Sequence, residues 1–255
     1  MAPTLSTPSL RVDGLSALVT GAGRGIGLAA AHALAQAGAR VTLVARSAAE
    51  IDAAAADIVA AGGQARARTL DVTDSAAVTG FMAEHGPFDI LVNNAGTNRP
   101  ALITDMTDAD YDAVMDLNVK ATMFVTREAA RSLVKAGRPG SIITISSQMG
   151  HVGGPKRALY CATKHAVEGM TKALAWELGP NGIRVNTICP TFIETAMTEK
   201  MFADSAFRTY VESRIALGRL GRLEDVMGAV VFLASDAAAM VTGSALMVDG
   251  GWTAA

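Results

Sequence analysis

The stretch SALVTGAGRGIGLAAAHALAQAG, residues 16–38, decides the fold of this chain. Its first five residues form the short apolar run of a buried strand, and residues 25–38 carry a helical apolar pattern that stops at a glycine. The glycines between them permit a tight turn, close helix packing and the approach of phosphate oxygens to the backbone. The free N–H groups of the helix start favour a pyrophosphate. A glycine cluster alone is weak evidence, but a strand before it and a helix after it favour dinucleotide binding.

The same alternation continues along the chain. Further strands are predicted at 40–45, 65–70, 88–93, 140–146, 182–188 and 245–249, and further helices at 47–63, 75–85, 108–136, 158–179 and 223–235. This pattern predicts an α/β fold, a single-domain Rossmann-type doubly wound parallel sheet of about seven strands with helices on both faces. We expect residues 1–13 to form a flexible tail and 14–255 to form one dinucleotide-binding domain. The irregular stretch 190–216 is expected to act as a substrate lid.

The composition excludes several classes of protein. With 255 residues, 50% hydrophobic residues and a net charge of −2, the chain can bury a large core but shows no basic excess for nucleic-acid binding. No apolar run reaches the ~18 residues of a membrane helix, and the N-terminus shows no signal-peptide pattern. Cys161 and Cys189 make no disulfide framework. We therefore expect a cytoplasmic protein with neither nucleic-acid nor membrane partners.

The end of the second predicted strand bears on the choice of cofactor. A carboxylate at this position would hold the ribose 2′-OH of NAD, but the chain has Ala45 followed by Arg46. A neutral residue followed by arginine suits the 2′-phosphate of NADP, and Arg24 in the glycine turn offers a second cation. NADP(H) is therefore favoured, and NAD(H) stays possible. The alternative is that Arg46 merely begins a solvated helix.

Motifs along nearly the whole chain resemble those of the short-chain dehydrogenase/reductases. The glycine turn, LDVTD, VNNAG, LNVKA, a serine thirteen residues before a tyrosine, ICPTFIET and MVDGG follow in the family's order over residues 14–252. The resemblance implies cofactor contacts from Gly21, Arg24, Gly25, Ile26, Gly27, Arg46, Asp71, Val72, Asn94, Ala95, Gly96, Tyr160, Lys164, Pro190, Ile193 and Thr195. The chain departs from the family's usual Pro-Gly at Pro190-Thr191, which leaves the shape of the nicotinamide pocket open.

Tyr160 and Lys164 lie four residues apart in the predicted helix 158–179, so they share one face. An ammonium close to a tyrosine lowers its pKa from about 10 toward the working pH of a general acid/base. Ser147 ends a strand and can hydrogen-bond a substrate oxygen. The resemblance implies a catalytic set of Asn118, Ser147, Tyr160 and Lys164, in which Asn118 holds a water linked to the lysine. In isolation, the Tyr-Lys pair would more often be a surface pair.

Specificity is expected from 148–155 and 190–216. The predicted substrate pocket contains Ser147, Met149, His151, Tyr160, Thr191 and Met197. His151 is more often an ordinary loop residue than a catalytic one, and the apolar residues of 190–216 could form a lid or a subunit interface. The other histidines, His32, His85 and His165, show no metal-ligand spacing with one another or with the cysteines, so no metal is predicted.

Three functions follow from these patterns. The leading one is an NAD(P)(H)-dependent alcohol dehydrogenase or ketone reductase for a sugar, polyol or small ketone, with Tyr160 as general acid/base. The second is a 3-oxoacyl-thioester reductase, for which Arg138 supplies one docking cation while Asn181 stands where another is expected. The third is a non-catalytic dinucleotide-binding regulator, since fold alone does not prove activity. The resemblance also implies a homotetramer acting on a small molecule.

Overall fold

Seven parallel strands form one sheet at the centre of the computed structural model, which describes residues 5–254 apart from the side chains of 196, 197 and 200. The strands are β1 (Ser16–Thr20), β2 (Arg40–Ala45), β3 (Gln64–Thr69), β4 (Ile90–Asn93), β5 (Gly140–Ile145), β6 (Ile183–Pro190) and β7 (Ala245–Val248). Their order is β3-β2-β1-β4-β5-β6-β7, and every neighbouring pair is parallel. The predicted fold class is confirmed.

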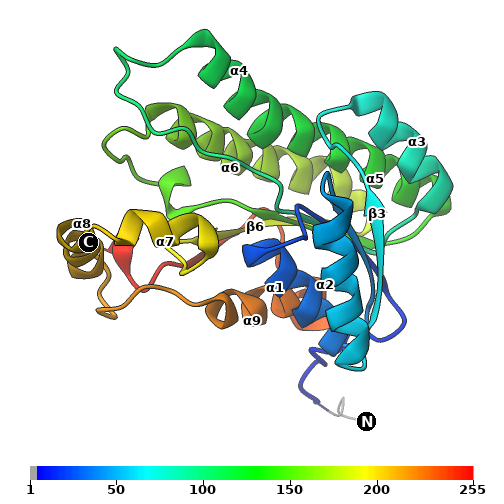
Figure 1. Ribbon diagram of the computed structural model, residues 1–255. Helices are drawn as coiled ribbons and strands as arrows, with labels where there is room; N and C mark the ends of the chain where they lie inside the picture. Colours follow the sequence, from blue (N-terminus) through cyan, green and yellow to red (C-terminus); the bar gives the residue numbers. More distant parts are fainter. Residues whose placement is uncertain (1–4, 255) are drawn as a thin grey trace.

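Helices cover both faces of the sheet (Figure 1). One layer holds α1 (Gly25–Gln36), α2 (Ala48–Ala60) and α9 (Leu223–Ala234), and the other holds α3 (Ser75–His85), α4 (Asp108–Met115), α5 (Thr122–Ala136) and α6 (Ala158–Leu178). Two short helices, α7 (Ala196–Phe202) and α8 (Ser205–Arg214), follow β6. None of the helices within residues 5–254 is long and apolar enough to cross a membrane.

The inner strands are mostly apolar because both of their faces are buried, whereas the edge strand β3 (QARART) is largely exposed. In β1, Val19 packs into the core under α1 and α9, while its neighbour Leu18 packs into the core under α3 and α5. The adjacent strand β4 repeats the alternation with Val92 and Leu91, which lie in register with Val19 and Leu18. Each such buried side chain contributes about 1.5–3 kcal/mol to folding. This two-sided burial explains why the strands appear in the sequence as continuous apolar runs.

The predicted helix 108–136 is not one α-helix. A capping box between Thr107 and Asp110 begins α4, and a π-helical turn at Asp116–Ala121 separates α4 from α5. The wider π turn interrupts the regular i→i+4 pattern, and such turns are frequent at functional sites. Asn118 lies within it and is buried. The turn therefore changes the direction in which Asn118 projects from the helix.

The predicted lid region forms a small core of its own. Phe192 packs edge-on against Phe202 and Phe207, and its ring centroid lies 5.8 Å from that of Trp252. These rings cover the buried side chains of Val211, Ile215 and Leu220. The aromatic residues of 190–216 thus pack with the C-terminal residues after β7.

Candidate active site

The glycine turn lies where the strand order reverses, between β1 and β4. Gly21 and Gly25 have φ angles of +62° and +58°, which residues with a side chain rarely adopt. A Cβ atom on Gly27 would lie 2.3 Å from the carbonyl oxygen of Gly21 and 2.4 Å from the amide nitrogen of Asn94. The turn therefore requires glycine at these positions, and it brings the start of α1 to the crevice that binds ligands in such sheets.

Side-chain hydrogen bonds join the two loops that border this crevice. The hydroxyl oxygen of Thr20 accepts from the backbone N–H groups of Asn94 (3.0 Å) and Ala95 (3.1 Å). In return, the Asn94 amide donates to the carbonyl oxygens of Thr20 (3.1 Å) and Gly21 (3.0 Å). Asn94 and Ala95 thus hold the backbone of the turn in place. Thr20, the residue directly before Gly21 in the glycine turn, shares this role.

The far end of the crevice carries the predicted nucleotide-selecting residues. β2 ends at Ala45, so no carboxylate stands at its tip, and Arg46 next to it is exposed. Asp71 accepts hydrogen bonds from Thr73, and these bonds, aided by the charge of Arg46, keep the pKa of Asp71 below its usual value. Arg24 is exposed and lies 3.4 Å from a carboxylate oxygen of Glu50. Because that pair is solvated, it leaves the guanidinium of Arg24 available to another anion.

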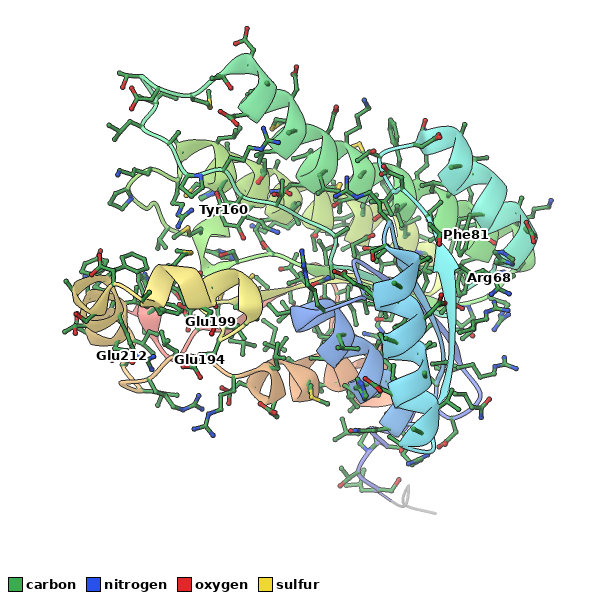
Figure 2. The ribbon with its side chains drawn as sticks, in the orientation of Figure 1. Arg68, Phe81, Tyr160, Glu194, Glu199 and Glu212 are labelled. Carbon is green, nitrogen blue, oxygen red and sulfur yellow. The ribbon has the colours of Figure 1, made fainter. Side chains whose placement is uncertain are left out.

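The carboxyl end of β5 and the start of α6 bring the predicted catalytic residues together. Ser147 is buried, and its hydroxyl donates to the side-chain oxygen of Gln148 (2.9 Å). The Lys164 ammonium nitrogen donates to the carbonyl oxygen of Ile145 (2.9 Å) and lies 5.5 Å from the centre of the Tyr160 ring. In Figure 2, Tyr160 lies between the layer of α6 and that of α7.

Burial controls the charges of these groups. It raises the pKa of Tyr160, while the Ser147 hydroxyl and the nearby Arg157 oppose that rise. Burial also lowers the pKa of Lys164 to about 8, against the attraction of Cys189 and Glu168. The predicted lowering of the Tyr160 pKa by the Lys164 ammonium is outweighed here by the burial of the phenol, and the role of the pair stays a prediction. The ammonium instead points to the Ile145 carbonyl, and the phenol is desolvated.

Comparison with known proteins decides the family. The family model described as enoyl-(acyl carrier protein) reductase matches residues 21–253. Gluconate 5-dehydrogenase of Gluconobacter oxydans is 42% identical, over 98% of this chain and 99% of its own length. L-xylulose reductase of Bos taurus is 38% identical, over 96% of this chain and 99% of its own. The chain belongs to the short-chain dehydrogenase/reductase family.

Other relatives of this dehydrogenase/reductase differ in the substrates that they are named for. The 3-oxoacyl-[acyl-carrier-protein] reductase of Thermotoga maritima is 40% identical, over 95% of this chain and 99% of its own. The crystal structure of a gluconate 5-dehydrogenase from Burkholderia cenocepacia in complex with NADP and tartrate is 37% identical. It superposes with a TM-score of 0.91 and covers 96% of this chain and 98% of its own.

Asn118 of this dehydrogenase/reductase is held firmly by its surroundings. Its amide donates to the carbonyl oxygen of Thr97 (2.9 Å) and to the hydroxyl of Thr163 (3.2 Å), and its oxygen accepts from Thr97 N–H (2.8 Å). A Cβ atom on Gly96 would lie 3.3 Å from that oxygen. Since Thr97 follows the VNNAG motif and Thr163 lies on α6, Asn118 in the π turn connects the loop after β4 to α6.

The segment after β6 approaches the glycine turn. A Cβ atom on Gly25 would lie 3.8 Å from the methyl group of Thr195, which begins α7 as its N-cap. Pro190 ends β6, and Ile193 is buried and bridges to Gly221. Of the remaining cofactor residues predicted, Ile26 and Val72 pack into the two cores.

The predicted substrate-pocket residues have different surroundings. Met149 is buried, and its N–H donates to the hydroxyl of Ser147 (3.1 Å). The hydroxyl oxygen of Thr191 is buried and has no hydrogen-bond partner among the described residues. His151 contacts Cys189 and Glu168. The side chain of Met197 lies outside the part of the chain that the structure describes.

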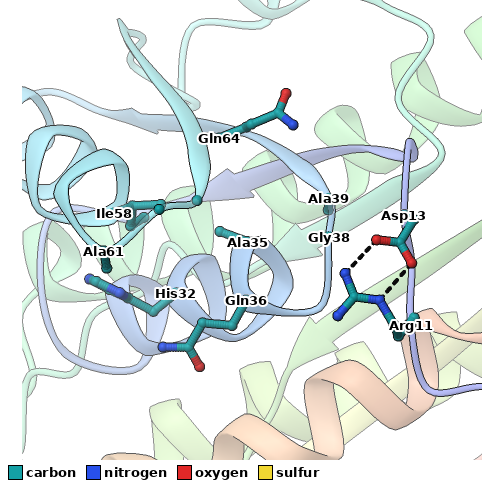
Figure 3. Close-up of a pocket in the computed structure, with 12 residues that line it drawn as sticks. Arg11, Asp13, His32, Ala35, Gln36, Gly38, Ala39, Ile58, Ala61 and Gln64 are labelled. Carbon is teal, nitrogen blue, oxygen red and sulfur yellow. Dashed lines mark hydrogen bonds and ion pairs between the residues drawn. The ribbon is translucent and has the colours of Figure 1, made fainter.

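Two pockets lie at different ends of the molecule. One of about 560 Å³ is lined by Glu194 and Thr195, which precede α7, and by residues of α7 and α8, among them Phe202 and Arg208. The other, of about 390 Å³, is lined by Arg11, His32 and the ends of α1 and α2 (Figure 3). This second pocket lies at the amino-terminal edge of the sheet, away from the predicted catalytic residues.

Proposed function

We propose that this dehydrogenase/reductase interconverts a secondary alcohol and a ketone of a sugar, sugar acid or polyol, with NADP(H) as its cofactor. One observation carries the proposal. Ser147, Tyr160 and Lys164 gather at the carboxyl edge of a doubly wound sheet, beside a glycine turn that only glycine can form. Relatives named for gluconate and xylulose, each aligned over nearly its whole length, support this substrate class.

The residues present fit a dinucleotide. The N-terminus of α1 has no side-chain cap, so its N–H groups are free for a pyrophosphate, and Gly21 and Gly27 let it approach. The missing carboxylate at Ala45, together with exposed Arg46, favours the 2′-phosphate of NADP. The NADP in the structure of the Burkholderia relative supports the same choice.

The catalytic residues divide the work of reduction. When bound, NADP(H) would supply the hydride that is added to the carbonyl carbon. Tyr160 donates its phenolic proton to the substrate oxygen, and Ser147 donates a hydrogen bond to the same atom as charge develops there. Lys164 stabilises the phenolate that is left, against the burial that raises the pKa of Tyr160, and the positive charge of the oxidised cofactor would add to this. In the oxidation of an alcohol, the phenolate accepts the proton.

Charge pairing argues against an acidic carrier protein as the substrate carrier. Arg138, which stands at one of the two positions where a docking cation is expected, is paired with the buried carboxylate of Asp89. Arg127 and Arg131 on α5 both contact the buried carboxylate of Glu128, at 2.7 and 3.0 Å. These cations neutralise buried acids, so they are not free docking charges. The similarity to a 3-oxoacyl reductase is the reason that this activity stays as the second candidate.

Arg157 favours a substrate that carries a carboxylate. It lies one helical turn before Tyr160, and its positive charge opposes the rise in the pKa of that residue. Its Nη1 atom is buried with no hydrogen-bond partner among the described residues. A buried guanidinium nitrogen without a partner is costly, and a carboxylate satisfies it in a bidentate manner. Gluconate carries such a group and a polyol does not. Arg157→Gln should raise KM for an aldonate about tenfold and leave KM for the matching polyol unchanged.

The chain is proposed to form a homotetramer in the cytoplasm. Met123 and Val134 on α5 and Trp176 on α6 are large apolar side chains exposed at 45%, 43% and 87%. Such exposed residues on long helices are typical of a surface that another subunit covers. The two free cysteines agree with a reducing compartment. We also propose that α7 and α8 act as the lid over the substrate.

Turnover with and without the Tyr160 hydroxyl tests the proposal. Tyr160→Phe should bind NADPH as the wild type does, measured by cofactor fluorescence, and lose at least ~100-fold in turnover of gluconate, xylulose or a related polyol, since general acid/base catalysis contributes 10²–10⁴-fold. Undiminished turnover in this variant would refute the role of Tyr160. Tight cofactor binding by the wild type with no turnover of the whole panel would favour a regulator.

A further inference from the structure

Three potential metal ligands meet one helical turn beyond the catalytic lysine. His151 follows the short 3₁₀ turn after Ser147, Glu168 lies on α6 four residues after Lys164, and Cys189 lies on β6. The Cys189 sulfur lies 3.5 Å from His151 Nε2 and 3.3 Å from Glu168 Oε1, and His151 Nε2 lies 3.7 Å from Glu168 Oε2. One ligand atom of each residue lies within 4.8 Å of the others.

These separations suit one zinc ion. Zinc bonds of about 2.3 Å to sulfur and about 2.0–2.2 Å to nitrogen or oxygen, at tetrahedral angles, place ligand atoms about 3.3–3.6 Å apart. The distances from the Cys189 sulfur to His151 Nε2 (3.5 Å) and to Glu168 Oε1 (3.3 Å) fall in that range, while His151 lies 3.7 Å from the other carboxylate oxygen, Oε2, so a small rotation of the carboxylate would bring one oxygen to both ligands. A thiol, an imidazole and a carboxylate also form a ligand set that prefers zinc to magnesium or calcium.

The surroundings of the three side chains resemble those of metal sites in proteins. Cys189 is fully buried and Glu168 is 5% exposed, whereas the His151 side chain is 31% exposed and leaves that side open for a water or a further ligand. The Thr187 hydroxyl donates to Glu168 Oε2 (3.0 Å) and orients the carboxylate, as outer ligands of metal sites do. The adjacent Ser146 hydroxyl is buried and has no partner among the described residues.

The charge balance also permits a dication. A coordinated thiol loses its proton, so a thiolate and a carboxylate together neutralise zinc. Lys164 is close enough to Cys189 and Glu168 to interact with their charges, and an electrically neutral zinc centre would not repel its ammonium group. Without a cation, Glu168 would rely on the Thr187 hydroxyl, the Cys189 thiol and His151 for its buried carboxylate.

We propose that His151, Glu168 and Cys189 bind one zinc ion, which ties the loop after Ser147 to α6 and β6. The ion would restrain the loop that carries Met149 and the wall of the substrate pocket. The zinc site is separate from the proposed reaction, because the proposed hydride and proton transfers use no metal. The sequence prediction of no metal rested on His32, His85 and His165, and the fold brings His151 to the two other ligands instead.

Zinc binding by the metal-stripped full-length protein tests this site. We expect one equivalent of Zn²⁺ per chain in competition with a chromophoric chelator, a higher Tm on loading, and a cobalt–thiolate absorption band when Co²⁺ is used instead. His151→Gln should weaken the zinc affinity at least ~10-fold. Cys189→Ser should abolish the cobalt–thiolate band. His165→Gln and Cys161→Ser remove the same residue types outside the cluster and should bind as the wild type does.

Two outcomes would overturn the proposal. One is the lack of stoichiometric zinc binding by the folded wild type, which would leave a hydrogen-bonded His-Glu pair as the explanation of the cluster. The other is equal affinity in His151→Gln and His165→Gln, which would mean that the ion binds elsewhere. His151→Gln changes a partly exposed side chain, so it keeps the test valid if the buried Cys189 variant does not fold. Neither outcome depends on which substrate the enzyme uses.

Discussion

Gly27→Ala tests whether the glycine turn requires glycine because there is no room for a side chain. The added methyl would lie 2.3 Å from the Gly21 carbonyl oxygen and 2.4 Å from the Asn94 amide nitrogen, so the turn must move or the amide must leave. Overpacking costs about 1–3 kcal/mol, and each lost amide hydrogen bond costs about 1 kcal/mol. Alanine in a helix returns about 0.5–1 kcal/mol. The net expectation is a loss of about 2 kcal/mol in the free energy of unfolding.

Thermal unfolding measures this loss directly. For a chain of this size, about 2 kcal/mol corresponds to a fall in Tm of roughly 4–8 °C. Gly80→Ala is the matched control, because Gly80 is an exposed position of α3 with no atom within 4 Å of a new Cβ, so its Tm should stay the same or rise. NADPH affinity should fall about tenfold or more in Gly27→Ala only. A Tm for Gly27→Ala that matches Gly80→Ala would refute the steric reasoning.

Three further variants probe charge and assembly. Burial lowers the pKa of Lys164 to about 8 from 10.5 in the unfolded chain, so the unfolded state binds more protons between these values, and stability rises with pH across that window. The difference in the free energy of unfolding between the wild type and Lys164→Met, measured by denaturant unfolding, should rise by on the order of 3 kcal/mol from pH 8 to pH 10.5. A difference that does not change with pH would contradict this expectation. Arg46→Ala should weaken NADPH binding about tenfold and leave NADH binding unchanged, and an equal loss for both cofactors would disprove the 2′-phosphate contact. If the proposed tetramer forms, Trp176→Glu should shift the protein to smaller species in sedimentation velocity, whereas Val59→Glu, an exposed position on α2, should not. An unchanged sedimentation coefficient in Trp176→Glu would exclude this helix face as the interface.

The sequence by itself determined the parts of the molecule that depend on local order along the chain. The bounds of β1 and β2 were predicted to the residue, because strands buried on both faces are mostly apolar between their flanking turns. The start of the predicted helix 47–63 is also a local feature, since Ser47 is the N-cap of α2 and its hydroxyl accepts from the Glu50 N–H. The glycine turn likewise followed from a steric demand within a few residues.

Only the tertiary structure decided what depends on burial and on contacts between distant segments. The π turn that aims Asn118 at Thr97 and Thr163 interrupts a stretch whose sequence is typical of one continuous helix. Tyr160 has a raised pKa because the packed layers desolvate it, and spacing to Lys164 carries no information on that. The meeting of His151 with Cys189, 38 residues apart, exists only because a loop and a strand end side by side at one edge of the sheet.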